Sequence, residues 1–574
     1  MKRLFLFMVF AVALLCSNAQ DTKVALAAAS ATSEQTKAGE VAANAIDGDL
    51  TTIWHTAYSG ASFPVTFDIT LSEVSHVDYV KYVPRQDGNV NGYWSKVEIL
   101  YCSTTDGSDF VSLGVFSLPS SAGTYDFYLP GNGIECGKLR LSVKQGRNGH
   151  ASAAEIELYA QDNTKRDLLE QYFEDELFTV LKPGVTSADG IGDSDVKALV
   201  NNILTNADAY KKFRVGEYEA YMTTSTLRDK LRISSQYNNY ENPTGVYLKA
   251  GESCVVAVSG IGDYYVGLKI KNWFLNESMS TYSLHNGINY ITATTEGNVF
   301  VDYYTDNFEK APNVKMHFIN APVQGYWDQE TMTNEDWKAM LKGRESNDST
   351  IIITRSQHAQ LAYPVCSWLQ YCPTDVDSLM TLYQQTQWAL RDLLGLERYG
   401  RQVKNRQLFY ATNYGFMAAG GEGAYCHHGS LGAIMTPDSK VFDFWGVGHE
   451  WGHNNQVTPG FKWSGCGETT NNIYASWAQL HFTGNSSKLR LEDEVTGIGE
   501  YSGMRGGRMQ TYFEEALRKG VSWQLQDGPD YHGATPETKT VAGYDADGKY
   551  WAFYVNGEYA MQGIDLTPIE DGAV

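Results

Sequence analysis

The chain has 574 residues, with 67 Asp and Glu against 45 Lys and Arg, and a formal net charge of −22 at pH 7. This acidic balance argues against a nucleic-acid-binding surface and against binding to anionic membranes. The length predicts several domains. Residues 1–19 predict a secretory signal peptide, because Lys2 and Arg3 precede an apolar run and a cleavage site of small residues. No other apolar run approaches the roughly 20 residues of a transmembrane span. We therefore expect a secreted, periplasmic or cell-surface protein without such a span.

The cysteine pattern is compatible with export but predicts no dense disulfide framework. The eight cysteines are widely spaced, and they form no Cys-x-x-Cys metal site. Disulfides are permitted in an exported protein, and Cys366 and Cys372 are near enough in sequence to pair. Cys16 leaves a lipoprotein anchor open, although Leu15 before it fits that cleavage poorly. Most other cysteines are expected to be small buried apolar residues.

Residues 20–161 predict an all-β module. Short alternating runs recur between turn residues, at 65–69, 77–83, 97–101, 139–143 and 156–159. In an earlier loop, Asp47, Asp49 and Thr52 supply carboxylate and hydroxyl oxygens on a tight turn, which suits Ca²⁺. An Asp-rich turn without a metal is the alternative.

This module resembles the discoidin-like sandwich of coagulation factors and of family 32 carbohydrate-binding modules. The matching landmarks are Ala45–Asp49 with Trp54-His55, Tyr82–Gln86 with Asn91-Gly92, Val97–Ile99 and Ala153–Ile156. The resemblance implies a glycan-binding module with a structural calcium ion. The implied calcium ligands are Asp47, Asp49, Thr52 and Glu155. The implied sugar-binding residues are His55, Arg85 and Asn91, with an exposed aromatic ring nearby at Tyr93 or Trp94.

The middle of the chain predicts a helical connector followed by a second β-sandwich. In residues 162–235, helical spacing of apolar residues predicts helices over 166–181, 193–207 and 228–233. Residues 236–322 return to strand patterns punctuated by glycines. The expected strands are 245–248, 253–258, 264–270, 288–292 and 299–304. We expect this sandwich to be a partner domain of the unit that follows.

Residues 323–535 predict a mixed α/β domain. Strands are expected at 351–354 and 408–411, and a long helix at 376–394. The glycine-rich stretch 415–429 is a candidate edge strand, whose backbone groups could pair with an extended peptide. His427 and His428 at its end could contact a substrate or lie in a surface loop, and the sequence leaves both open.

The segment 444–456 contains the pattern His-Glu-x-x-His. On a helix, His449 and His453 project from one face, one turn apart. This spacing can place two ring nitrogens on one Zn²⁺, while Glu450 can reach a metal-bound water without being a ligand. The alternative is an amphipathic helix whose His pair merely caps or packs.

Glu468 is the candidate third ligand, because it lies fifteen residues past His453 after a glycine-rich turn. A second helix beginning near Glu468 and running antiparallel to the first would bring its carboxylate back over the His pair. Two His and one Glu with an open position form the catalytic pattern of hydrolytic zinc enzymes.

These residues resemble the enhancin-like zinc metallopeptidases, a gluzincin family that includes bacterial mucin-degrading enzymes. The matched positions are His449, Glu450, Gly452, His453, Asn454 and Gln456, then Glu468 with Thr470–Tyr474, and the β region 243–252. The resemblance implies an endopeptidase acting on O-glycosylated, mucin-type glycoproteins. His449, His453 and Glu468 would hold zinc, and Glu450 would be the general base. Asn454, Gln456 and Asn472 are candidates for orienting the His pair.

The C-terminal region differs from what this resemblance leads us to expect. A helix is predicted over 507–519, but residues 536–574 indicate a short β segment with a hairpin around Asn556-Gly557. We therefore expect the cleft-closing helices of the family to be reduced or missing here. This keeps a second hypothesis open, a glycan-binding adhesin with an inactive or impaired peptidase domain. A glycoside hydrolase has no support, because no carboxylate pair stands out.

Overall fold

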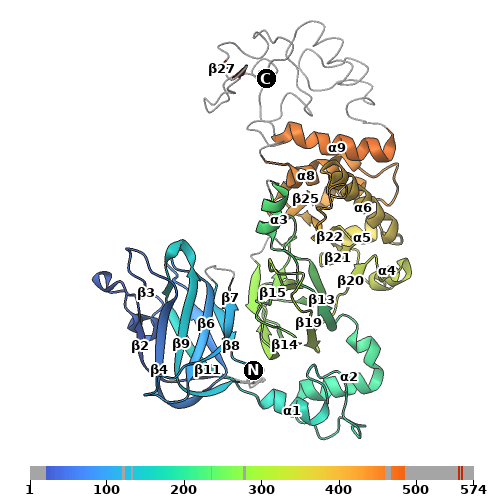
Figure 1. Cartoon of the computed structure of the whole chain (residues 1–574). Helices are drawn as coiled ribbons and strands as arrows, with labels where there is room; N and C mark the ends of the chain where they lie inside the picture. The colour runs from blue at the N-terminus through green and yellow to red at the C-terminus, as the bar shows by residue number, and fades with distance from the viewer. Residues whose placement is uncertain are drawn as a thin grey trace, which may run out of the picture. The chain divides into compact units, whose positions relative to one another are not determined.

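Figure 1 shows a computed structural model of the chain, which is a multidomain α+β protein. The structure describes residues 21–118, 123–130, 133–233, 235–275, 279–458 and 467–484, with residues 554, 555, 558 and 559. The predicted signal peptide and the predicted helix over 507–519 lie outside these residues. The chain divides into two compact units. The first contains 1–220, 246–270 and 280–323, and the second contains 221–245, 271–279 and 324–574.

The N-terminal module is a β-sandwich, as expected. One sheet has the order β2-β4-β9-β6-β7 and the other the order β1-β11-β5-β8, while β3 pairs with β10. Burial alternates along the first half of β4, because successive side chains in a strand point to opposite faces. The strands are β1 (Thr22–Lys23), β2 (Leu26–Ala31), β3 (Trp54–His55), β4 (Val65–Val77), β5 (Tyr79–Val83), β6 (Trp94–Cys102), β7 (Val111–Ser117), β8 (Tyr125–Tyr128), β9 (Ile134–Gly146), β10 (Ser152–Ala153) and β11 (Glu155–Ala160). Short 3-10 turns lie at Thr36–Ala38, Ala42–Ile46 and Arg147–Gly149.

The region expected to be a helical connector contains three helices and one strand. They are α1 (Thr164–Tyr172), α2 (Ser194–Lys211), α3 (Thr224–Leu231) and β12 (Val215–Tyr218). Helix α1 ends earlier than predicted, because the chain becomes extended at Phe173, which forms an antiparallel bridge with Leu181. Helix α2 begins as predicted, with the Asp193 side chain accepting hydrogen bonds from the amides of Asp195 and Val196.

The second β-sandwich consists of two four-stranded sheets. Their orders are β12-β19-β14-β17 and β13-β18-β15-β16, so β12 of the preceding region belongs to this fold. Periodicity missed β16, which pairs with the preceding β15, and β19, which pairs with the sequence-distant β12 and β14. The strands are β13 (Asn242–Leu248), β14 (Ser253–Ser259), β15 (Gly267–Lys271), β16 (Ser280–Ser283), β17 (Gly287–Thr292), β18 (Gly297–Asp302) and β19 (Val314–Ile319).

A fully buried histidine in β19 makes the first unit sensitive to acid. Burial lowers the pKa of His317 to about 4. Its Nδ1 lies 2.7 Å from the carbonyl of Leu177 and its Nε2 lies 3.0 Å from the Tyr210 hydroxyl, so the neutral ring is satisfied. In the unfolded chain this pKa is about 6.5. As pH falls from 6.5 to 4, the unfolded state binds the proton first, and the free energy of unfolding should fall by about 3 kcal/mol. Urea unfolding of the wild type and of His317→Gln across this pH range measures the effect. An equal change of the unfolding free energy with pH in both proteins would contradict it.

The second unit is built on a six-stranded mixed sheet with the order β20-β21-β22-β23-β25-β24. The predicted strands at 351–354 and 408–411 and the predicted long helix are present as β21, β23 and α6. The strands are β20 (Tyr326–Asp328), β21 (Ile351–Arg355), β22 (Ala359–Pro364), β23 (Gln407–Thr412), β24 (Met417–Gly420) and β25 (Gly423–His427). The helices are α4 (Asn334–Leu341), α5 (Val365–Tyr371), α6 (Val376–Leu393), α7 (Gly432–Met435), α8 (Phe444–Asn455) and α9 (Gly467–Thr483), and a 3-10 turn lies at His428–Ser430.

Two smaller sequence expectations are also resolved. Cys366 and Cys372 are both free thiols, so the suggested disulfide between them is absent. Near the C-terminus, β26 (Tyr554–Val555) pairs antiparallel with β27 (Glu558–Tyr559), which agrees with the hairpin predicted there. No helix among the described residues is both long enough and apolar enough to cross a membrane.

Candidate metal centre

Helix α8 carries the His-Glu-x-x-His pattern. Its start is capped by Asp443, whose Oδ1 accepts a hydrogen bond from the Gly446 amide at 2.9 Å. One face of the helix is fully buried through Val447 and Trp451, and the Trp451 indole N–H donates to the Leu408 carbonyl in β23 at 3.2 Å. The sheet therefore fixes the rotation of α8 about its own axis.

Helix α9 runs antiparallel to α8 at close range. A Cβ added at Gly448 would lie 3.1 Å from the Ala475 Cα, and one at Gly452 would lie 3.0 Å from the Asn471 carbonyl oxygen. Ordinary side chains at these two positions would push the helices apart. The two glycines thus let the backbone of α9 approach the turn that carries the His pair, as the sequence hypothesis required.

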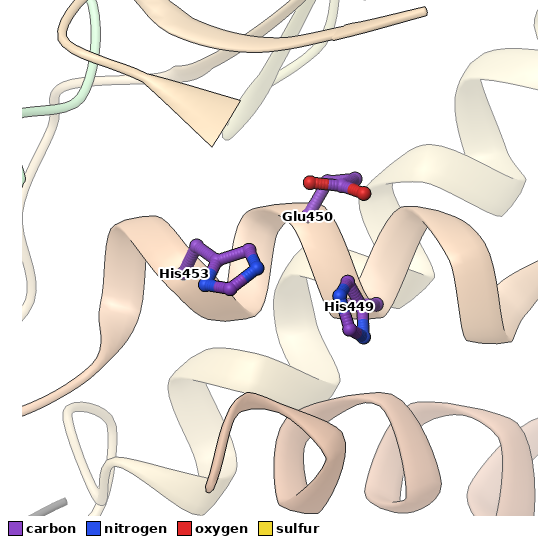
Figure 2. A group of neighbouring side chains, drawn as sticks. All are labelled: His449, Glu450 and His453. Atoms are coloured by element: carbon purple, nitrogen blue, oxygen red, sulfur yellow. The ribbon is translucent and has the colours of Figure 1, made fainter. Parts of the chain in front are cut away.

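The Nε2 atoms of the two histidines face one point. The Asn471 amide nitrogen lies 2.9 Å from His449 Nε2 and 2.8 Å from His453 Nε2. An amide N–H₂ donates to acceptors, so both ring nitrogens direct a lone pair toward this place. Figure 2 shows both imidazoles on α8, with Glu450 on the turn between them. The ligating atoms of His449, Glu450 and His453 lie within 4.8 Å of one another.

The second nitrogen of His449 is held by the neighbouring helix. Its Nδ1 lies 2.7 Å from Asn472 Oδ1, and donation to this amide oxygen leaves Nε2 as the acceptor. Asn472, one of the three predicted orienting residues, therefore does contact the His pair. Gln456 instead donates to the Gly467 carbonyl and to the Thr470 hydroxyl, which ties the end of α8 to the start of α9. The side-chain amide of Asn454 donates instead to Ser235 and to the Gly420 carbonyl.

Glu450 and Glu468 lie on the two facing helices. Glu450 is 6% exposed. Burial raises the pKa of the Cys426 thiol to about 12, and the negative charge of the nearby Glu450 adds to this rise. Glu468 lies in the first turn of α9, three residues before Asn471. Its side chain is outside the described part of the structure, so its role as third ligand stays a prediction.

These residues fit a zinc ion. Neutral imidazole Nε2 atoms are ordinary zinc ligands, and the second nitrogen of His449 has the hydrogen-bond partner that zinc-binding histidines usually have. The Asn471 amide marks the point on which the two lone pairs converge. Zinc could bind at that point once this amide turns away.

The glycine-rich stretch forms the edge strand that was predicted. β24 is the last strand of the six-stranded order and pairs antiparallel with β25 alone among the described strands. His427 ends β25, and its Nδ1 accepts a hydrogen bond from the Gly429 amide. His428 packs edge-on against the Phe274 ring at 5.1 Å. Neither belongs to the group around His449.

The predicted sugar-binding residues gather in one part of the N-terminal sandwich. The charge of Arg85 acts on His55, whose pKa is lowered chiefly by burial. Arg85 is 6% exposed and forms a bidentate ion pair with Asp87. The side-chain oxygen of Asn91 accepts a hydrogen bond from Asn148 at 2.7 Å. The Arg85 head group is thus held by Asp87 on its own loop, and the Asn91 amide by Asn148 on a neighbouring loop.

The prediction of an exposed aromatic ring at Tyr93 or Trp94 was wrong. Tyr93 and Trp94 are 4% and 0% exposed, and Trp94, which begins β6, belongs to the core and stacks on Tyr82. The exposed ring is Tyr58, which is 57% exposed and lies 5.2 Å from the His55 ring. Its position three residues after His55 was the available signal in the sequence.

A second histidine in this cluster was also missed. His150 packs 5.0 Å from His55 across the module, from the loop before β10. Nothing in the sequence pairs these two positions, which β3 and β10 bring together.

The predicted calcium ligands lie around one loop. Asp47 Oδ2 accepts a hydrogen bond from the Thr52 hydroxyl at 2.8 Å, and Glu155 Oε2 accepts one from the Gly48 amide at 3.0 Å. Glu155 is 2% exposed, and its pKa is raised by burial, with the charge of Asp47 adding to the rise. Asp49 turns its carboxylate to Thr51 and offers its carbonyl oxygen to Thr52.

Comparison with known proteins agrees with this layout. Residues 325–545 match the family Peptidase M60, enhancin and enhancin-like, and residues 28–156 match the F5/8 type C domain. An A type blood N-acetyl-alpha-D-galactosamine deacetylase from Flavonifractor plautii is 35% identical over 122 residues, which are 21% of this chain and 15% of that protein.

Two solved structures are similar in fold. A metallopeptidase from Bacteroides thetaiotaomicron is 22% identical and covers 58% of each chain, with a TM-score of 0.49. The structure of the CBM32-1, CBM32-2 and M60 catalytic domains of Clostridium perfringens ZmpB is 17% identical, with a TM-score of 0.44. It covers 83% of this chain and 53% of that one. The chain thus spans little more than half of these solved structures and a smaller share of the curated relative. It carries an N-terminal F5/8 type C domain and a C-terminal peptidase M60, enhancin-like metallopeptidase domain, and the His449–His453 site lies in the latter.

Proposed function

We propose that the chain is an exported zinc-dependent endopeptidase that hydrolyses peptide bonds in O-glycosylated, mucin-type glycoproteins. The observation that carries the proposal is the convergence of the two histidine Nε2 atoms on one point beside Glu450, inside a metallopeptidase domain. His449 and His453 would hold zinc together with Glu468. The mucin-type substrate is supported by the resemblance of these residues to mucin-degrading enhancin-like enzymes.

The chain's own residues suit peptide hydrolysis. A zinc ion bound here would lower the pKa of a water molecule and polarise the scissile carbonyl. Glu450 takes the proton from the attacking water and delivers it to the leaving amine. Asn472 holds His449 in the tautomer whose Nε2 carries the lone pair that would ligate zinc. The edge strand β24 can pair with an extended substrate backbone.

The decisive experiment is digestion of an O-glycosylated mucin by protein from Gln20 onward. The fragments are identified by mass spectrometry, beside a chelator-treated sample and His449→Ala. We expect cleavage only by the untreated wild type, with about one zinc per chain that is lost in His449→Ala. A folded, zinc-free wild type would contradict the proposal. Bound zinc without cleavage, in a protein that still retains mucin, would instead support the adhesin hypothesis.

The N-terminal module would concentrate the enzyme on its substrate by binding glycans. His55, Arg85 and Asn91 provide polar groups, and Tyr58 provides an exposed apolar ring. We further propose that Asp47, Asp49, Thr52 and Glu155 hold a structural calcium ion. Calcium should raise the unfolding temperature of the wild type in calorimetry but not that of Glu155→Gln.

Tyr58 should contribute stacking energy to glycan binding. We expect Tyr58→Ala to weaken binding of galactose or N-acetylgalactosamine about fivefold, because loss of an aromatic contact costs about 1 kcal/mol beyond burial. Tyr58→Phe keeps the ring and should bind nearly as well as the wild type. Isothermal titration measures both, with Tyr399→Ala, which removes another exposed tyrosine, as the matched control. Equal loss in Tyr58→Ala and Tyr399→Ala would contradict a role for Tyr58.

A further inference from the structure

Asn454 follows the second histidine directly, yet it contacts other parts of the second unit. It is 1% exposed, and its Nδ2 donates to the Gly420 carbonyl of β24 at 3.2 Å and to the Ser235 hydroxyl at 3.1 Å. The Ser235 hydroxyl also lies 3.1 Å from the same carbonyl. A carbonyl oxygen only accepts, so this geometry defines which end of the Asn454 amide faces it. Asn454 therefore joins the metal helix to the edge strand.

A second contact joins the other ends of the same two elements. A Cβ at Gly446 in α8 would lie 3.5 Å from the Met417 sulfur in β24. Gly446 and Asn454 are eight residues apart, about 12 Å along a helix. Met417 and Gly420 are three residues apart, about 10 Å along a strand. β24 therefore follows α8 in the same direction past the His-Glu-x-x-His turn.

The register of β24 determines which of its backbone groups stay available. The His427 amide donates to the Phe416 carbonyl at 2.7 Å, and antiparallel strands alternate the direction of these groups. Ala418 thus directs its backbone groups toward β25, whereas the Gly420 carbonyl at the end of β24 accepts hydrogen bonds from Asn454 and Ser235. The backbone groups of Met417 and Ala419 point to the opposite edge, where no described strand pairs with them.

The Ser235 side of this connection is anchored independently of β24. Ile233 forms an antiparallel bridge with Val457, just after α8. The Tyr237 hydroxyl donates to Asn455 Oδ1 at 2.6 Å, and the Tyr474 hydroxyl of α9 donates to the Asn455 carbonyl at 2.9 Å. The segment around Ser235 is thus held to the end of the metal helix. Through its hydrogen bonds to Ser235 and Gly420, Asn454 links this anchored segment to β24.

We propose that Asn454 is a positioning residue for the peptide substrate. By holding the Gly420 carbonyl, it fixes the position of β24 relative to α8 and its metal site. The backbone groups of Met417 and Ala419 can then pair with the substrate backbone. This inference rests on the proposed peptidase function. It differs from the orienting role expected from the sequence, because the residue acts on the strand and leaves both histidines untouched.

Asn454→Asp tests the proposal, because aspartate keeps the shape and cannot donate to the Gly420 carbonyl. Two zinc-binding probes separate the strand from the metal, namely acetohydroxamate and an alanine dipeptide hydroxamate. We expect Asn454→Asp to weaken the dipeptide probe about tenfold and acetohydroxamate less than twofold, with zinc content unchanged. Ser235→Ala, which keeps the Asn454–Gly420 hydrogen bond, should have a smaller effect. Asn206→Asp on exposed α2 makes the same change elsewhere and should have none.

Hydrogen exchange gives a readout that needs no catalysis. Amides in residues 415–427 should exchange faster in Asn454→Asp than in the wild type, with unchanged exchange in α6. Equal weakening of both hydroxamates, or a wild type that binds the dipeptide probe no better than acetohydroxamate, would overturn the proposal. If the two hydroxamates distinguish Asn454→Asp from the wild type as expected, but the wild type cleaves no mucin, the positioning role of Asn454 stands and only the proposed mucin substrate is wrong.

Discussion

Glu450→Gln should lower kcat for mucin hydrolysis by about 10²–10⁴, with little change in KM. The amide keeps the size of the side chain but cannot accept the proton of the attacking water. Because Glu450 is no ligand in the proposed arrangement, the variant should keep about one zinc per chain. Steady-state kinetics on a mucin-derived glycopeptide, with zinc measured by mass spectrometry, gives both quantities.

Two comparisons make this result specific. His453→Ala should lose activity and zinc together, whereas Glu450→Gln should lose only activity. Loss of zinc in Glu450→Gln would place its carboxylate among the ligands. Unchanged kcat would assign the base to another residue and contradict the mechanism. After removal of zinc, both variants should unfold at nearly the same denaturant concentration as the metal-free wild type.

Trp451→Ala should reduce the free energy of unfolding of the metallopeptidase domain by about 3–5 kcal/mol. The Trp451 ring is fully buried, with the Tyr383 ring of α6 at 5.5 Å and the Phe409 ring of β23 at 5.9 Å. Truncation leaves a cavity and removes the hydrogen bond to the Leu408 carbonyl. The loss also frees α8 to turn about its axis, so zinc affinity should fall as well.

The control is truncation of a partly exposed tryptophan to alanine in the neighbouring helix. Trp477 in α9 is 37% exposed, and Trp477→Ala should cost less than half as much as Trp451→Ala. The urea midpoint of the transition in which zinc is released measures both. Equal shifts would show that the packing of Trp451 on the sheet does not stabilise the site.

The local pattern of α8 was readable because its signals are close in sequence. Asp443 caps the helix, the His pair has helical spacing, and buried residues occupy the opposite face. The antiparallel α9 was predicted from the glycine-rich turn, and Gly448 and Gly452 explain how closely it packs. The contact between Asn472 and His449 was one candidate among three, since three nearby amides have the same chemistry in a sequence.

Contacts between distant segments were not readable in this way. The partners of Asn454 are Ser235 and Gly420, and periodicity does not relate three such positions. Likewise Trp94 was taken for an exposed ring, although its strand register turns it into the core. A shift of one residue along a strand reverses which face a side chain occupies.

The sequence by itself determined the two sandwiches, the helix with its His pair and the presence of a metallopeptidase domain, because each depends on spacing within a short segment. Only the tertiary structure decided that Tyr58 and His150 join His55, that Asn472 holds His449 and that Asn454 holds β24. These pairings depend on which surfaces of separate strands and helices meet. That outcome is settled by burial of whole faces and by the satisfaction of buried polar groups.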